Sequence, residues 1–251
     1  MFGAFSTEMD LPKTEVKFTY LILSQPRTGS TMITSALLSS GLAGVPVEYF
    51  HTDYLKHLFQ PLSLNAVQKY YQEVVSRRTS RNGVFGMKLH HIQFQHLFMD
   101  EDTVTPSGVK FLKSFDKIIV TSRRDKVAQA ISNLIALRTD QWNSEKEEHA
   151  GKQNYEFSKH DTPQLLNFIR GAVEGESFWN EVCSQLNLTP LRIIYEELSQ
   201  SPQFELSKIL GHLGLPAIDI APQTVKLSRD SNRDAKQKFL KEIGVEWTAA
   251  S

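Results

Sequence analysis

Short apolar runs recur along the chain, and longer amphipathic segments separate them. A run of roughly four to eight residues that is rich in β-branched and aromatic side chains is typical of a buried β-strand. Four runs fit this description: Phe18–Leu23, Gly83–Leu89, Lys117–Thr121 and Leu191–Tyr195. We therefore predict four buried strands.

Apolar residues in the intervening segments recur at the spacing of amphipathic helices. The predicted helices are Met32–Leu38, Ser63–Arg78, a segment that follows Arg123-Arg124-Asp125 and ends near Leu137, Thr162–Gln185, Phe204–Leu213 and Ser231–Ile243. Gly41 and Gly214 are suited to end two of them, and Thr162-Pro163 predicts an N-cap followed by proline at the first helical position. The polar segment Asn143–His160 is weakly periodic and predicts a loop or a mobile flap.

Strands that alternate with helices predict an α/β fold with a mostly parallel central sheet flanked by helices. We expect a single domain over residues 17–251, preceded by an N-terminal extension over residues 1–16. In such folds the functional site lies at the carboxyl ends of the strands.

The composition excludes several classes of protein. Hydrophobic residues make up 40% and charged residues 22%, and the 28 basic side chains balance the 28 acidic ones. These values argue against a disordered or fibrous chain and against a polybasic nucleic-acid binder. The single cysteine, Cys183, excludes an intramolecular disulfide framework and fits a reducing compartment. With no long apolar run and no secretory signal in Met1–Val16, we expect a soluble cytoplasmic protein without a transmembrane segment.

The segment SQPRTGST, residues 24–31, lies between the first predicted strand and helix. A turn before a helix N-terminus presents free N–H groups and the positive end of the helix dipole, which suits a phosphate. A Walker A loop would place lysine after the second glycine, whereas here the cation is Arg27, before Gly29. The loop therefore suits a phosphate better than Mg-ATP hydrolysis; the alternative is an ordinary polar turn.

Arg123 and Arg124 stand at a second junction between a strand and a helix. Two guanidinium groups there could bind a second phosphate, and Ser132, about two helical turns on, could add a hydroxyl. The alternative, an exposed basic helix start, is disfavoured because cations at a helix N-terminus oppose its dipole.

Four further side chains are considered for chemistry. Glu48 has apolar and aromatic neighbours, which would raise the pKa of its carboxyl and make it a better general base; the alternative is a surface glutamate. Lys88, at the end of the second predicted strand, could stabilise charge on a transferring group. His90 and His91 follow it, and adjacent histidines are more often surface or capping residues. No histidine pair has HExxH spacing, so no metal site is predicted.

These segments together resemble the sulfotransferases, most closely the bacterial trehalose 2-sulfotransferase family. The matching segments, in order, are YLILSQPRTGST, GVPVEYF, GVFGMKL, SRRDKVAQAIS, RTDQW and IIYEELSQSP. They extend from about Thr19 to Leu215 with similar spacing, and several motifs in register are far more specific than any one of them.

The resemblance implies a P-loop-like sulfotransferase fold and in-line transfer of the sulfuryl group of 3′-phosphoadenosine 5′-phosphosulfate (PAPS) to a carbohydrate or glycolipid hydroxyl, without a metal. It implies catalytic roles for Glu48 as the base and for Arg27 and Lys88. It implies that PAPS is bound by Arg27, Thr28, Gly29, Ser30, Thr31, Arg123 and Ser132. Tyr49, Phe50, His51 and Trp142, with Glu48, would line the acceptor pocket, because sugars stack on aromatic faces. It also suggests a homodimer and gives no role for nucleic acid.

The chain departs from the family pattern in three places. Ser122 and Arg138 stand where the family has histidine and glutamine, and the C-terminal loop reads KLSRDSNRD, with Arg229 and Arg233 as candidate phosphate contacts. Two other functions therefore stay open. One is a P-loop kinase or NTPase, and the other is an inactive sulfotransferase homologue that binds the nucleotide.

Overall fold

The computed structural model describes residues 7–51, 55, 63–140, 142, 155–221 and 230–245. The strands are β1 (Phe18–Ser24), β2 (Val84–His90), β3 (Met99–Asp100), β4 (Thr103–Val104), β5 (Lys117–Ser122) and β6 (Leu191–Ile194). The helices are α1 (Ser30–Ser39), α3 (Leu64–Arg78), α4 (His91–Phe98), α5 (Pro106–Lys113), α6 (Lys126–Thr139), α7 (Thr162–Gln185), α8 (Tyr195–Gln200), α9 (Pro202–His212) and α10 (Asp230–Glu242), with 3₁₀ turns η1 (Thr7–Met9) and η3 (Lys159–Asp161).

The central sheet has four parallel strands in the order β2-β1-β5-β6. All four predicted strands are confirmed, each with boundaries within one residue of the prediction. Since the strands are parallel, their carboxyl ends meet at one edge of the sheet. Ser24, His90, Ser122 and Ile194 are the last residues of the four strands and mark this edge.

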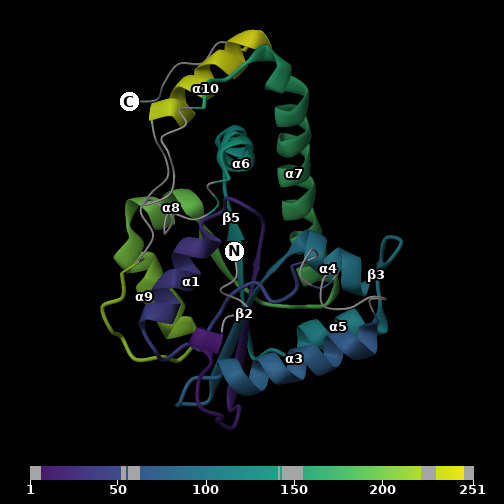
Figure 1. Cartoon of the computed structure of the whole chain (residues 1–251), viewed down its shortest axis with the longest axis vertical. Helices are drawn as coiled ribbons and strands as arrows, with labels where there is room; N and C mark the ends of the chain where they lie inside the picture. Colours follow the sequence, from purple (N-terminus) through teal and green to yellow (C-terminus); the bar gives the residue numbers. More distant parts are fainter. Residues whose placement is uncertain are drawn as a thin grey trace.

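Helices cover both faces of the sheet, as the alternation of side chains along β1 requires. Tyr20 and Ile22 point to the face covered by α1, α8 and α9, and they share a buried cluster with residues of those helices such as Leu210. Leu21 and Leu23 point to the other face and pack with buried residues of α3, α4, α5 and α7. Figure 1 shows α1, α8 and α9 on one side of the strands and α3, α4 and α5 on the other. The structure is thus the predicted α/β arrangement.

A third buried cluster joins α6, α7 and α10. Its members include Leu134 of α6, Leu165 of α7 and Phe239 of α10, all fully buried. Figure 1 shows α10 at the top of the view, beside the start of α7. This cluster anchors the C-terminal helix to α6, the helix that follows β5.

The start of α7 differs by one residue from the prediction. Asp161, not Thr162, is the N-cap, and its carboxylate makes no capping bond to α7. It is used instead by Tyr155, by the backbone N–H of Ser158 and by Arg138. The predicted loop Asn143–His160 falls largely outside the described residues; of its last part, Lys159–His160 belong to η3.

The pattern of apolar residues missed α4, the β3–β4 hairpin, α5 and α8. These elements have two to eight residues, too few for a periodic pattern to stand out. His90 directly precedes α4, and its backbone N–H donates to Gln93 Oε1 at 3.0 Å, which fits the capping interpretation.

Residues ahead of β1 pack against the end of α3. Asp10 accepts from Arg77 and Arg78 at 3.1 Å each, and the side chain of Arg78 is only 5% exposed.

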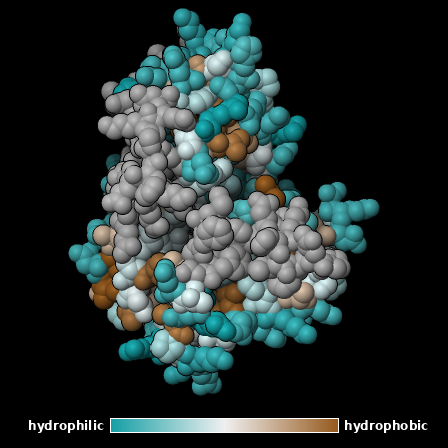
Figure 2. All heavy atoms as spheres, in the orientation of Figure 1, coloured by the Kyte–Doolittle hydropathy of each residue, from teal (hydrophilic) through white to brown (hydrophobic). Residues whose placement is uncertain are grey.

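On the face in Figure 2, hydrophobic residues form small groups among hydrophilic ones. Within the described ranges, none of the helices combines the length and apolar character needed to span a bilayer.

Candidate functional site

The loop after β1 makes a tight approach to α8. Gly29, the N-cap of α1, has a left-handed backbone with φ of 81°. A Cβ at this position would lie 2.9 Å from a ring carbon of Tyr195, so both the conformation and the space require glycine. The Thr28 hydroxyl fixes the loop from inside, 2.8 Å from the carbonyl of Gln25 and 2.7 Å from the Thr121 hydroxyl of β5.

Arg27 connects this loop to α6. Its Nε donates to Ser132 Oγ at 2.9 Å, and one terminal nitrogen donates to the carbonyl of Trp142 at 3.0 Å. Its own carbonyl accepts from Arg123 at 3.3 Å. Arg27 has a positive φ of 65°, which is uncommon for a residue with a side chain and typical of functional loops. The structure therefore brings together Arg27, Ser132 and Arg123, which the sequence assigns to two different phosphates.

Arg123 lies beside Arg27, and the nearby carboxylates of Glu196 and Asp125 offset part of its charge. Its guanidinium stacks over the Tyr195 ring at 4.3 Å, and its buried Nε has no hydrogen-bond partner among the residues described. Burial lowers the pKa of Arg123. Burial and the nearby charge of Arg123 lower the pKa of Arg27. A bound anion would relieve both effects, because it supplies the missing acceptor and the missing charge.

Arg124 does not join this pair. It forms an ion pair with Glu197 and is largely exposed. The carboxylate of Glu196 accepts from the backbone N–H groups of Arg124 and Asp125 at 3.1 Å each. Asp125 caps α6, so the dipole of that helix already has its negative partner. Of the two adjacent arginines, only Arg123 faces the loop of Arg27.

Glu48 lies at the carboxyl end of β2, where it forms an isolated parallel bridge with Lys88. Its Oε1 is 2.8 Å from Lys88 Nζ and 3.1 Å from His90 Nε2. Its Oε2 accepts from Gln93 Nε2 at 2.8 Å. Lys88 also donates to Thr31 Oγ1 at 3.3 Å, which links Glu48 to the first turn of α1. The side chain of Glu48 keeps 23% of its surface exposed.

The predicted pKa shift of Glu48 is wrong in sign. Burial does raise the pKa, but the charges and hydrogen bonds of His90 and Lys88 outweigh burial and hold it well below its usual 4.5. The apolar neighbours in the sequence suggested the opposite, because Lys88 and His90 come from a strand about forty residues away in the chain. Glu48 is therefore ionised at neutral pH.

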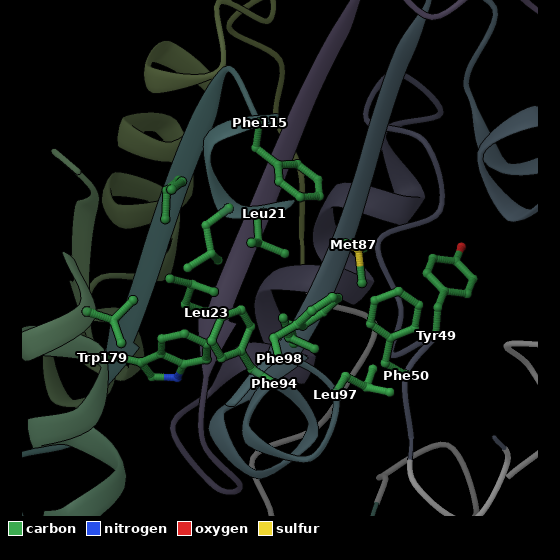
Figure 3. Packing of buried hydrophobic residues seen from close by; sticks show 14 of the residues in the cluster. Leu21, Leu23, Tyr49, Phe50, Met87, Phe94, Leu97, Phe98, Phe115 and Trp179 are labelled. Atoms are coloured by element: carbon green, nitrogen blue, oxygen red, sulfur yellow. The ribbon is translucent and has the colours of Figure 1, made fainter. Parts of the chain in front are cut away.

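Of the four aromatic residues predicted for the acceptor pocket, two lie in the core and two are partly accessible to solvent. Tyr49 and Phe50 are 0% and 1% exposed and lie in the core, as Figure 3 shows, where Phe50 contacts the rings of Phe98 and Phe111. Because packing already uses their faces, we drop both from the acceptor pocket. His51 is half-buried, and Trp142 is 37% exposed.

Near the C-terminus, Arg229 lies outside the described residues, and Arg233 lies exposed on α10. The α10 residue tied to the site is Lys236, which forms an ion pair with Asp125.

Ser30, at the start of α1, is buried. In the described ranges no three His, Cys, Asp or Glu side chains are grouped as metal ligands would be.

Sequence reasoning missed the supporting residues Tyr195, Glu196 and Gln93. Tyr195 and Glu196 belong to the YEEL segment, which was identified as a motif. The sequence did not predict that Tyr195 contacts Gly29 and Arg123 or that Glu196 binds the β5–α6 loop. Gln93 gave no signal, because α4 itself was not predicted.

Comparisons with known proteins agree with this architecture. Trehalose 2-sulfotransferase of Mycobacterium tuberculosis (strain ATCC 35801 / TMC 107 / Erdman) is 22% identical over 247 residues, covering 85% of this chain and 90% of the relative. The crystal structure of a sulfotransferase from Alicyclobacillus acidocaldarius is 14% identical and covers 91% of this chain and 94% of that one, with a TM-score of 0.50. The sulfotransferase domain from the curacin biosynthetic pathway is 13% identical, covers 94% of this chain and 100% of that one, and has a TM-score of 0.47.

The fold is the P-loop-like fold of the sulfotransferases. The sequence model of the Stf0 sulphotransferase family matches residues 19–242, which include almost all of β1, the strands β2 to β6 and the whole of α10. The chain belongs to the Stf0 sulphotransferase family.

Proposed function

We propose that this sulfotransferase moves the sulfuryl group of PAPS to a hydroxyl of a carbohydrate or a glycolipid. The observation that carries the proposal is the pair Arg27–Arg123, two half-buried cations at the carboxyl ends of the strands, with an unpartnered buried Nε on Arg123 among the residues described. The named relative, a trehalose 2-sulfotransferase, supports a carbohydrate as the acceptor.

The donor would be held at the loop after β1. Arg27 and the backbone of residues 28–31 would bind the 5′-phosphosulfate, at the N-terminus of α1. Arg123 would bind the 3′-phosphate, which distinguishes PAPS from ATP. Ser132 accepts a hydrogen bond from Arg27, so its own O–H can donate to an anion. Arg229, and Arg233 on α10, stay candidates for contacts to the phosphates of the nucleotide.

Glu48 would act as the base. The acceptor oxygen forms a bond to sulfur, the bond between sulfur and the phosphate oxygen breaks, and the hydroxyl proton passes to Glu48. PAPS supplies the sulfuryl group and the leaving phosphate. The lowered pKa of Glu48 keeps the carboxylate ionised and ready to accept the proton, which becomes acidic only as the new bond forms. Lys88, between Glu48 and Thr31, would stabilise charge on the sulfuryl oxygens.

The acceptor would lie against the exposed part of Glu48. Trp142, whose carbonyl binds Arg27 and whose side chain is partly exposed, is the aromatic candidate for stacking against a sugar, and His51 is a polar one. A cytoplasmic location and a homodimer remain part of the proposal.

Thermal denaturation with 3′-phosphoadenosine 5′-phosphate, beside ATP and 5′-AMP, tests the donor. A ligand at a hundred times its dissociation constant adds about 2.7 kcal/mol, and each kcal/mol raises Tm by roughly 2–4 °C for a domain of this size. We expect a rise of several degrees with the bisphosphate and little with the others. A rise with ATP alone would contradict the proposal and favour a kinase or NTPase.

Transfer of labelled sulfuryl from PAPS to trehalose and to glycolipid sugars tests the reaction itself. We expect a labelled sugar ester. Binding of the bisphosphate without transfer to any carbohydrate would contradict the enzymatic part of the proposal and point to an inactive homologue.

A further inference from the structure

The carboxylate of Glu48 is held by three donors, and this leaves one position on it open. An ionised carboxylate has about four acceptor positions, two on each oxygen. Lys88 Nζ and His90 Nε2 occupy those of Oε1, and Gln93 Nε2 occupies one of Oε2. The remaining position, on Oε2, is the one that a substrate hydroxyl can use.

Gln93 is fixed at both ends of its amide. Its Oε1 accepts from the backbone N–H of His90 at 3.0 Å, and its Nε2 donates to Glu48 Oε2 at 2.8 Å. The amide oxygen accepts one of these bonds and the amide nitrogen donates the other, so only one of the two possible orientations of the amide satisfies both. Gln93 is 5% exposed and stands in the first turn of α4, which limits its freedom to move.

His90 is fixed by Ser24. The hydroxyl of Ser24, at the end of β1, lies 2.9 Å from His90 Nδ1, and Ser24 is 0% exposed. A neutral ring would accept this hydroxyl hydrogen at Nδ1, and a charged ring would donate to the hydroxyl oxygen. In these two states Nε2 carries a hydrogen that it can donate to Glu48 Oε1, 3.1 Å away. Ser24 thus determines which nitrogen faces the carboxylate.

We propose that His90 and Gln93 are positioning residues, which orient Glu48 so that a single lone pair of Oε2 receives the proton of the acceptor hydroxyl, with Ser24 orienting His90 in turn. The inference rests on the proposed role of Glu48 as the base. It requires no additional group, because the proton moves directly from the acceptor oxygen to Oε2 as the bond between oxygen and sulfur forms.

The positioning residues stand on rigid elements, which supports this role. Ser24 and His90 are paired in register as the last residues of adjacent strands, and Gln93 stands in the helix that follows β2. The hydrogen bonds of these three side chains lead to Glu48 and to one another, not to Arg27 or Arg123. Donor binding and base orientation are therefore separable.

Four variants test the proposal. His90→Phe keeps the ring shape but removes the donor to Glu48, whereas His90→Gln retains an N–H donor. Gln93→Leu removes the donor to Oε2, and His96→Gln, an exposed histidine on the same α4, is the control. The readouts are kcat and KM for PAPS-dependent transfer, the Tm rise with 3′-phosphoadenosine 5′-phosphate, and the pKa of Glu48 from carboxyl ¹³C NMR of the substrate-free protein.

For His90→Phe and Gln93→Leu we expect kcat to fall about tenfold to a hundredfold, the scale of a hydrogen bond to a charged group, with little change in KM or in the Tm rise. His90→Gln should recover much of kcat. His90→Phe should also raise the pKa of Glu48. In the wild type His90 and Lys88 both lower that pKa, and in the variant only Lys88 would still do so. His96→Gln should change none of these quantities.

Unchanged kcat in both donor-removing variants would overturn the proposal, and so would equal activity of His90→Phe and His90→Gln. If His90→Phe does not fold, Gln93→Leu and Ser24→Ala give the same test from α4 and β1. Failure of the proposed function would give different results. Either Glu48→Gln would retain full transfer, or the wild type would transfer nothing. In both cases the pKa of Glu48 would still change in His90→Phe.

Discussion

The two charged groups at the carboxyl edge of the sheet differ in how their charge is balanced. On the donor side, Arg27 and Arg123 lie close together, and Arg123 has a buried Nε without a partner in the described part of the chain. On the acceptor side, Glu48 is surrounded by Lys88, His90 and Gln93, which together occupy most of its acceptor positions.

This difference distinguishes a site that binds an external ligand from a hydrogen-bond network within the protein. On the donor side, burial lowers the pKa of both arginines, and the charge of Arg123 lowers that of Arg27 further, although Glu196 and Asp125 offset part of the charge of Arg123. An anion from outside the protein would stabilise both guanidinium groups and give Arg123 Nε an acceptor. The acceptor side is balanced from within, and its contacts determine the orientation and the pKa of one carboxylate. A buried donor without a partner therefore indicates a ligand, whereas a carboxylate held by several protein groups indicates tuning of that carboxylate.

The largest expected effect is on turnover when the network loses its carboxylate. Glu48→Gln removes the base but keeps the shape, so kcat should fall by about a hundredfold to ten-thousandfold, the range of general base catalysis. The Tm rise with 3′-phosphoadenosine 5′-phosphate should be nearly unchanged, because the donor side is untouched. Equal loss of turnover and donor binding would show that the two sides are not separable.

His91 provides a third case, a buried imidazole for which no ion pair with a carboxylate is seen among the described residues. It is 9% exposed, its Nδ1 has no hydrogen-bond partner there, and burial, together with the neighbouring His90, lowers its pKa from 6.5 to about 4. Between pH 6.5 and 4 the unfolded chain binds more protons at this site, so the free energy of unfolding should fall as the pH falls, by about 3 kcal/mol in all.

Urea denaturation of wild type, His91→Leu and the control His96→Gln between pH 7 and 5 measures this effect. This range lies above 4.5, the usual pKa of a glutamate carboxyl, so the lowered pKa of Glu48 contributes little there. We expect the wild type and the control to lose about 2 kcal/mol more over the range than His91→Leu, because the lowered pKa of His212 contributes equally in all three proteins. Parallel curves for all three proteins would contradict the assignment.

Arg123→Ala tests the donor side directly. Loss of a charge-assisted hydrogen bond to the 3′-phosphate should weaken PAPS binding about tenfold to a hundredfold. Binding of adenosine 5′-phosphosulfate, which lacks that phosphate, should weaken much less. Arg124→Ala is the matched control, because Arg124 is paired with Glu197 and largely exposed. Calorimetric titration measures both ligands, and equal weakening would remove the 3′-phosphate role.

The smallest effect concerns the loop that supports the donor side. Gly29→Ala places a Cβ 2.9 Å from Tyr195 at a φ of 81°, while Gly41→Ala has a similar φ of 67° with no atom within 4 Å. Both should lose roughly 1–2 kcal/mol of stability from the left-handed backbone. Only Gly29→Ala should also weaken binding of the bisphosphate, because it displaces the ring under Arg123. Equal binding by the two variants would separate the loop from Tyr195.

The α/β class, the four strands and the longer helices follow from the order of residues alone. Apolar periodicity reports burial directly, and the segments around Phe18, Val84, Ile119 and Ile193 are apolar because helices cover both faces of the sheet. Arg27, Glu48 and Arg123 were also found as candidates in this way, since their places beside predicted strands and motifs are local features of the chain.

The pairing of these residues depends on the tertiary fold. The sign of the Glu48 pKa shift depends on Lys88 and His90, which the bridge between residues 48 and 88 brings next to it. Tyr49 and Phe50 entered the core instead of a pocket because neighbours distant in the chain cover their rings. Charge balance and burial depend on contacts between separated segments, and a pattern read along one segment does not contain them.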